Sequence, residues 1–423
     1  MNKKSTARTW PHTLRALQYP HFRLFMSGQL VSLIGTAVQG VAQSWLVYRL
    51  TGSPKMLGIV AFASLIPALA LAPFGGMVAD RFDRRRVVIG AVATSAVSAL
   101  FLAVLTLSNM IQVWHVLLLG VVNGCANAFE IPARQSMVSE LVDRSDLPNA
   151  IALNSSAFNM SRVVGPAIGG MLLGLVGEGW CFLGNVVTYI PVLCSLMLIP
   201  FVMRARPMHT APALTAIAEG FNYFRQSPPL LATGAAVMTM GLAGNSYLTL
   251  MPVFADKMLH GGPHTLGYLM GAAGIGALIG ALQLAARANP TGLSRWIEFG
   301  MLGCGLGLLV FAWSPWLLLS MPVLVITGLS GVLGTTSANT LIQSLAPEQL
   351  RGRVVSIYIM ILMGSTPIGA LISGALAELI GISATTTINA LLCIVGGIWY
   401  GRRMAVMRAG YAASREAAST SNK

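Results

Sequence analysis

Long apolar segments, separated by short polar connections, occupy most of the chain and restrict its fold more than any other feature. A helix needs about 20 mostly apolar residues to cross a bilayer. Twelve segments meet this requirement, at roughly 23–48, 56–79, 87–107, 112–133, 150–176, 181–202, 229–253, 265–286, 296–313, 316–340, 354–379 and 384–401. Only helices or closed barrels satisfy backbone polar groups in lipid, and the sequence shows no barrel pattern. It therefore predicts an all-α polytopic membrane protein with twelve transmembrane helices.

The composition excludes a water-soluble protein, because 55% of the residues are hydrophobic and only 9% are charged, against roughly a quarter charged in soluble domains. The formal net charge of +14 would suit a nucleic-acid partner only if the basic residues gathered on one polar surface. They lie instead in short loops between apolar segments, where they suit anionic lipid. Membrane lipid is thus an expected partner, and nucleic acid is not.

Several chemical functions are also disfavoured. The five cysteines lie within apolar runs, His and Cys residues do not cluster, and the nucleotide-binding pattern G-x-x-x-x-G-K-[ST] is missing. The sequence therefore predicts no metal site, no cofactor and no ATP-driven pump. A membrane enzyme or a non-transporting receptor would need clustered catalytic groups or a large soluble domain, and neither is present.

The positions of the basic residues predict the orientation in the membrane. With the N-terminus in the cytoplasm, 23 of the 27 Lys and Arg residues fall on the cytoplasmic side. Arg49, Lys55 and Lys257 fall outside, and Arg162 lies within a helix. Cytoplasmic loops carry such an excess of positive charge. The prediction is a multi-pass protein of the inner membrane with both termini in the cytoplasm.

The longest polar connection divides the chain into two halves. The predicted organisation is an N-terminal segment at 1–22, a six-helix bundle at 23–202, a linker at 203–228, a second six-helix bundle at 229–401 and a cytoplasmic tail at 402–423. Within the linker, Leu214 to Phe224 can form a short amphipathic helix. A faint repeat between Glu140–Gly170 and Ser344–Gly369 supports the division. Duplicated halves are typical of transporters that use alternating access, and we expect a monomer.

A dense group of charges follows the second apolar segment. The pattern Gly76-x-x-x-Asp80-Arg81-x-x-Arg84-Arg85 resembles the loop signature of the major facilitator superfamily. Gly76 would let the second helix approach a neighbour closely. The resemblance implies that Asp80 faces the start of the eleventh helix, at Arg351-Gly352-Arg353, and latches the halves together when the cytoplasmic side is shut. The alternative is that the arginines only determine topology.

The fifth apolar segment carries a second motif. Gly165-Pro166-Ala167-Ile168-Gly169-Gly170 resembles the core of the superfamily's antiporter signature, which is typical of exporters, although the upstream part of the signature is degenerate. Proline kinks a helix, and glycines allow tight helix packing. Other segments, such as Trp45-Leu46-Val47-Tyr48 and Arg351-Gly352-Arg353-Val354, resemble the branch of the superfamily that contains the enterobactin exporter.

Arg162 is the deepest basic residue, whereas many proton-coupled drug exporters of the superfamily carry an arginine in the fourth helix, which here has no charge from Leu117 to Ala128. Intramembrane charge is expensive and indicates function, and Glu130 is the partner that we expect for Arg162. No helix offers a proton-carrying acid at mid-depth, since Asp256 and Glu378 lie near outer helix ends. Candidate cavity residues are polar or adaptable side chains, any of which can instead serve helix packing: Gln39, Gln43, Asn123, Asn127, Asn245, Tyr247, Tyr358 and Met363.

Together these features predict a secondary transporter with no catalytic residues. We expect it to export a small organic molecule, either a siderophore or an amphiphilic metabolite of similar size, by alternating access. A proton is the expected coupling ion. A multidrug exporter, or a lipid or lysolipid transporter with the same fold, remains as an alternative.

Overall fold

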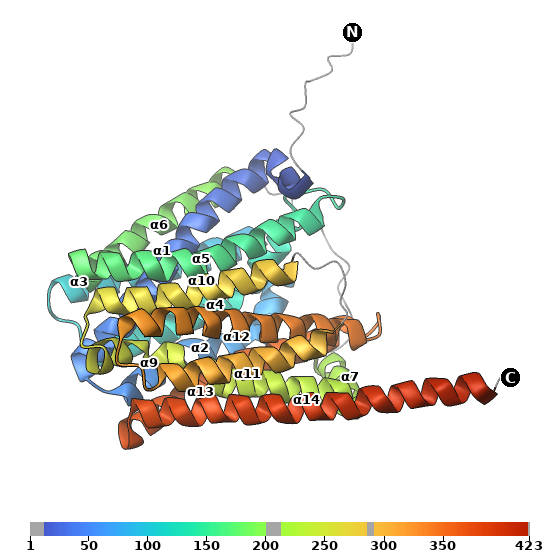
Figure 1. Cartoon of the computed structure of the whole chain (residues 1–423). Coiled ribbons are helices and arrows are strands. Elements are labelled where there is room, and N and C mark those ends of the chain that lie inside the picture. Colours follow the sequence, from blue (N-terminus) through green and yellow to red (C-terminus); the bar gives the residue numbers. More distant parts are fainter. Residues whose placement is uncertain (1–11, 200–212, 286–291, 422–423) are drawn as a thin grey trace, which may run out of the picture.

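The computed structural model describes residues 12–199, 213–285 and 292–421, and these residues form helices, turns and short connections, without a strand. Figure 1 shows the helices running side by side along one common direction. The first part of the chain forms η1 (His12–Gln18), α1 (Pro20–Thr51), α2 (Pro54–Arg81), α3 (Arg84–Leu107), α4 (Val113–Val138), α5 (Leu147–Val176) and α6 (Glu178–Leu198).

The remaining helices follow the predicted linker. They are α7 (Ala213–Gln226), α8 (Pro228–Thr239), η2 (Met240–Gly244), α9 (Tyr247–Val253), η3 (Phe254–Met258), α10 (Pro263–Ala285), α11 (Leu293–Phe311), α12 (Leu317–Leu345), α13 (Arg351–Ile380) and α14 (Ile382–Ser421). The amphipathic helix expected at Leu214 to Phe224 lies within α7. Residues 1–11, 203–212 and 422–423 of the predicted N-terminal segment, linker and tail are outside the described part, as are 200–202 at the end of the sixth predicted segment and 286–291 at and after the end of the eighth.

Eleven of these helices, α1–α6 and α10–α14, are long and apolar enough to cross a membrane. The seventh predicted segment, 229–253, is not one continuous α-helix, and it is not among these eleven. Two π-helical turns, η2 and η3, divide the stretch from Pro228 to Met258. A π-turn widens the helix locally, and it depends on how the neighbouring helices pack rather than on apolar content.

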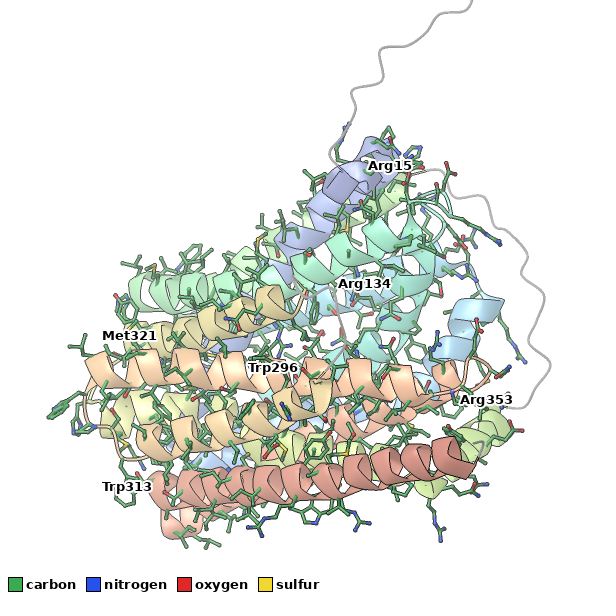
Figure 2. The ribbon with its side chains drawn as sticks, turned by 45° about the vertical axis from the view of Figure 1, so that its right-hand side comes forward. Arg15, Arg134, Trp296, Trp313, Met321 and Arg353 are labelled. Carbon is green, nitrogen blue, oxygen red and sulfur yellow. The ribbon has the colours of Figure 1, made fainter. Side chains whose placement is uncertain are left out.

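Helices α1–α6 pack among themselves and so do α8–α14, while the two groups meet along α2 with α13 and α5 with α10. We call one end of the molecule the Asp256 end, where η3 lies, and the opposite end the arginine end, where Arg84, Arg134 and Arg353 lie. In Figure 1 the helices of the two groups diverge toward the arginine end, on the right. Figure 2 shows Arg134 and Arg353 on the separate groups there.

The buried apolar side chains follow the same division. One cluster contains residues of both groups, including Val47, Leu57, Phe254 and Ala377, and it lies toward the Asp256 end. The other two clusters lie toward the arginine end, one entirely within η1–α6 and the other entirely within α7–α14. The two groups therefore share a core at the Asp256 end and have separate cores at the arginine end.

Glycines bring the backbones of the two groups into contact. A Cβ built on Gly374 of α13 would lie 3.1 Å from the Cα of Gly58 in α2, and one built on Gly170 of α5 would overlap the Cα of Gly267 in α10. Gly58, Gly374 and Gly267 all lie in the half of the molecule toward the Asp256 end. Close packing of this kind needs the absence of a side chain.

Candidate functional site

The arginines of the α2–α3 connection bind to their own group. Arg84 forms an ion pair with Glu140, and its Nε donates to the carbonyl of Ala79 at 3.1 Å. Arg85 donates to the carbonyl of Met197 at 2.7 Å, while Arg81 is exposed. The connection is shaped by Asp83, whose side chain accepts from the backbone N–H of Arg85 at 3.0 Å and so caps α3.

The opposite partner of the predicted latch is also engaged elsewhere. Arg353 forms an ion pair with Glu219 of α7, and Arg351 is exposed. The side chain of Asp80 is outside the described part. Among the side chains that the structure does describe, the connection and the start of α13 form no ion pair or hydrogen bond with each other. The latch remains a prediction about another conformation.

The close approach of α2 to a neighbour comes from Gly75, one residue from the position expected. A Cβ on Gly75 would overlap the carbonyl oxygen of Ala128 in α4, whereas a Cβ on Gly76 would have nothing within 4 Å. The expectation for Gly76 in this conformation was wrong, because one residue along a helix rotates the side chain by about 100°.

The helix-five motif lies between two neighbouring helices. Gly165 and Gly169 face α1, where a Cβ on Gly169 would be 3.1 Å from the Cα of Val38. Gly170 faces Gly267 of α10, which belongs to the other group. Pro166 is buried, and because it has no N–H it leaves the carbonyl of Arg162 without its usual helical hydrogen bond. The motif thus packs α5 closely against α1 of its own group and against α10 of the other group.

Arg162 and Glu130 are not brought together. Glu130 forms an ion pair with Arg134, one turn along the same helix, at 3.0 Å. The guanidinium of Arg162 lies 6.0 Å from the centroid of the Phe158 ring, and Tyr247 of α9 is close enough to interact with it electrostatically. No carboxylate within the described residues lies within 4.0 Å of Arg162.

The predicted cavity residues divide into two sets. Gln39 accepts from the Nδ2 of Asn185 at 2.6 Å, and the hydroxyl of Tyr358 donates to the carbonyl of Thr335 at 3.0 Å, so both join helices within one group. Tyr247 is buried. The remaining residues keep surface: Gln43, Asn123 and Asn245 are half-buried, whereas Asn127 and Met363 are exposed.

Sequence reasoning missed a set of hydrogen bonds that joins the two groups at the Asp256 end. The hydroxyl of Tyr48 in α1 donates to Oδ2 of Asp256 at 2.8 Å, and the hydroxyl of Ser53 donates to Oε2 of Glu378 in α13 at 2.9 Å. The sequence did indicate that both carboxylates lie at helix ends on one side of the predicted membrane. It did not indicate their hydrogen-bond partners, because each bond joins residues more than 200 positions apart.

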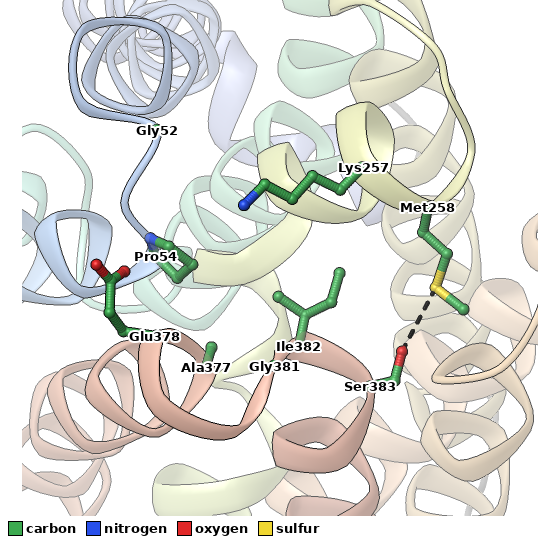
Figure 3. A pocket seen from close by; sticks show the side chains of 9 residues that line it. All are labelled: Gly52, Pro54, Lys257, Met258, Ala377, Glu378, Gly381, Ile382 and Ser383. Carbon is green, nitrogen blue, oxygen red and sulfur yellow. Dashed lines mark hydrogen bonds between the residues drawn. The ribbon is translucent and has the colours of Figure 1, made fainter.

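A cavity of ≈ 460 Å³ lies beside these bonds. Its lining joins the α1–α2 connection to η3 and to the α13–α14 connection: Gly52, Pro54, Lys257, Met258, Ala377, Glu378, Gly381, Ile382 and Ser383. Figure 3 shows Lys257 extending from η3 toward Pro54, on the side where Glu378 lies. The hydroxyl of Ser383 lies 3.8 Å from the sulfur of Met258.

The chain before α1 is bound to the α4–α5 connection and the first turn of α5 at the arginine end. The backbone N–H of Ala16 donates to Asn149 at 2.8 Å, and Arg15 forms an ion pair with Asp146 at 3.2 Å. Tyr19 donates to both Asp143 and Asp146. Burial and these carboxylates raise the pKa of Tyr19 to about 12, so its hydroxyl remains a donor at neutral pH.

Comparison with known proteins places this architecture among membrane transporters. The sequence profile of a family described as transmembrane secretion effector matches residues 12–420. A staphyloferrin A transporter of Staphylococcus aureus is 26% identical over 88% of this chain and 94% of its own length. The multidrug efflux pump Tap of Mycolicibacterium fortuitum is 29% identical over 89% and 93%. The enterobactin exporter EntS of Shigella flexneri is 25% identical over 94% of each.

Solved structures of low identity share the fold. The nucleoside transporter NupG superposes with a TM-score of 0.69 at 14% identity, covering 91% of this chain and 99% of its own. A bacterial homologue of the human lysosomal transporter Spinster, in an inward-facing and unoccupied conformation, gives 0.67 at 16% identity, covering 93% and 97%. The relatives and the fold are those of transporters and not of enzymes.

Proposed function

The chain belongs to the transmembrane secretion effector family of the major facilitator superfamily, and we propose that it is a secondary transporter that exports a small organic molecule across the inner membrane by alternating access. The substrate class that we propose is a siderophore or a similar amphiphilic metabolite. Support comes from two relatives named for siderophores, a staphyloferrin A transporter and an enterobactin exporter. The alternative is multidrug efflux, which the similarity to Tap favours, or lipid transport.

The proposed topology has twelve spans in two six-helix halves. Eleven are the long helices described above, and the stretch from α8 to η3 would cross as a twelfth, divided span. With it included, α1–α6 and α8–α14 hold six spans each. The distribution of Lys and Arg residues supports a cytoplasmic position for the arginine end and both termini.

One observation carries the mechanism, namely the unequal contact between the two groups. They share a core and backbone contacts at the Asp256 end, and they have separate cores at the arginine end. In the proposed topology this arrangement is closed to the outside and open to the cytoplasm. A cytoplasmic solute would enter here, and rocking of the halves would expose it to the outside.

In the opposite conformation, the halves would close at the arginine end. Arg84 now pairs with Glu140, and Arg353 pairs with Glu219. In the opposite conformation Arg84 would approach α8–α14, and Arg353 would approach α1–α6. Asp80 would accept hydrogen bonds at the start of α13, near Arg351. An aspartate can bind both to arginines and to the first N–H groups of a helix.

Export against a gradient needs an energy source, and we propose proton antiport. Asp256 and Glu378 join the two groups at the outer side only. In this proposal they hold the outer side closed and do not carry the coupled proton across the membrane.

Uptake into everted membrane vesicles tests the proposal, because export from the cell becomes accumulation in the vesicle. Enterobactin, staphyloferrin A, ethidium and a lysophospholipid are offered separately, with vesicles lacking the protein as the control. We expect one siderophore to accumulate when the lumen is acidic and to be released by a protonophore. Accumulation of ethidium alone would support multidrug efflux instead. Equal siderophore accumulation with and without the proton gradient would exclude proton antiport.

A further inference from the structure

We propose that Arg162 binds an anionic group of the transported molecule, so that the substrate is an amphiphilic organic anion. This inference rests on the proposed transport function and names the substrate class. It starts from the depth of the residue. Arg162 lies 15 residues from the beginning of α5 at Leu147 and 14 from its end at Val176, or about 20 Å along the helix from each. A membrane-spanning α5 therefore holds this charge near the middle of the bilayer.

The direction of the side chain follows from the contacts of α5. Gly165 and Gly169 face α1, while Val163 and Gly170 face α10 of the other group. Met171, which is 53% exposed, marks the outer surface of the molecule. Arg162 is nine residues from Met171, which is about 180° around a helix. It therefore points inward, between the two groups, and not toward lipid.

The inward position does not provide a counter-charge. Within the described residues, no carboxylate lies within 4.0 Å, and Glu130 is occupied by Arg134. Arg162 nevertheless keeps exposed surface, so a molecule entering from between the groups can reach it. Its neighbours are the ring of Phe158, whose centroid is 6.0 Å from the guanidinium, and the phenol of Tyr247, which interacts with it electrostatically. A charge at this depth is costly unless it is paired, and an anionic substrate would pair it.

The surroundings also limit the kind of anion. A guanidinium binds a carboxylate, sulfonate or phosphate through two parallel hydrogen bonds. Phe158 lies one turn before Arg162 and is 45% exposed, so it presents an aromatic face beside the charge. Neutral polar solutes would leave the guanidinium unpaired, and organic cations would be repelled by it. An apolar or aromatic body that carries at least one acidic group fits both neighbours.

Binding of two matched probes to the purified full-length protein tests the inference without requiring transport. The probes are 1-naphthoate and 1-naphthamide, which have the same ring and differ in charge. Isothermal titration is done at millimolar probe concentrations. We expect the acid to bind roughly 10-fold or more tightly than the amide, the effect of a charge-assisted hydrogen bond. Equal affinities, or no binding of either probe, would overturn the proposal.

Substitutions then assign the preference to this residue. Arg162→Gln should remove the preference for the acid, whereas Arg225→Gln, a matched change at an exposed arginine of α7, should keep it. An Arg162→Gln variant that still prefers the acid would overturn the proposal. Where Arg162→Gln does not purify as a monodisperse protein, Arg162→Lys serves instead. It keeps the charge but not the two parallel bonds, so acid binding should weaken several-fold while amide binding stays unchanged.

The two proposals fail separately. Vesicles that accumulate only a neutral or cationic solute, from a protein that shows no preference for naphthoate, would refute the anion site and leave the transport function standing. A purified protein that prefers naphthoate through Arg162, in vesicles that accumulate none of the offered solutes, would refute the proposed transport of those solutes and keep the site.

Discussion

The hydrogen bond between Tyr48 and Asp256 should help to hold the outer side closed, and Tyr48→Phe removes it with little other change. The phenylalanine ring can keep the edge-on contact with Trp45, whose ring centroid is 6.1 Å away. Only the hydroxyl that donates to Asp256 at 2.8 Å is lost. Since this bond joins α1 to η3 of the other group, it exists only while the two groups are in contact at the Asp256 end.

The magnitude follows from the charge and exposure of the acceptor. A hydrogen bond to a charged group contributes about 1.5–3 kcal/mol net. Asp256 is exposed, so water replaces the phenol easily and the lower value applies. About 1.5 kcal/mol corresponds to roughly a tenfold change in an equilibrium constant. Tyr48→Phe should thus raise the ratio of outward-open to outward-closed molecules about tenfold.

Double electron–electron resonance between two spin labels measures this ratio. Ser108→Cys, between α3 and α4, and Leu318→Cys, in α12, place exposed labels at the Asp256 end of each group, in a background without the five native cysteines. Tyr223→Phe is the matched control, because its hydroxyl binds the carbonyl of Leu345 within one group. An unchanged long-distance population in Tyr48→Phe, or an equal rise in Tyr223→Phe, would refute the reasoning.

Three further predictions use other contacts. Gly170→Ala places a Cβ against the backbone of Gly267 and should weaken outer closure by about 1–3 kcal/mol, measured with the same labels; Gly40→Ala, where a Cβ meets nothing within 4 Å, should have little effect. Asp80→Asn should slow transport in vesicles while leaving the amount of folded protein unchanged, and wild-type rates would contradict the latch. Gln39→Leu leaves Asn185 without its partner and should cost about 1–3 kcal/mol of stability, seen as a lower melting temperature; Gln43→Leu, at a half-buried position, serves as its control.

The membrane-spanning helices were predictable because a bilayer leaves an apolar segment few alternatives. The segment predicted at 87–107 is α3, Arg84–Leu107, and the segment predicted at 150–176 is α5, Leu147–Val176. Length and apolar content decide such elements locally. The interruption at η2 was not predictable in the same way, since apolar content is continuous across it, whereas η3 contains two charged residues, Asp256 and Lys257.

The side-chain partners were harder to predict than the helices. Glu130 was expected to pair with Arg162, but Arg134 is four residues away on the same helix, and i,i+4 pairing wins because it needs no tertiary arrangement. That spacing was visible in the sequence. The pairing of Tyr48 with Asp256 was not, since it depends on how two separate groups of helices meet. The latch between Asp80 and the start of α13 stays a prediction, because it requires the two groups to meet at the arginine end.

Helix α5 connects these features, because the seal and the charge are on the same helix. Close contacts between α5 and α10 begin at Gly174, near the Asp256 end, and continue to Val163. The Cα of Val163 lies 2.9 Å from a Cβ built on Gly274 of α10. Arg162 is the next residue toward the arginine end. The unpaired charge therefore stands where the sealed part of the interface gives way to separate cores. If the anion pairs with Arg162, neutralising this charge removes the cost of enclosing it, and we expect the loaded protein to close at the arginine end more readily than the empty one.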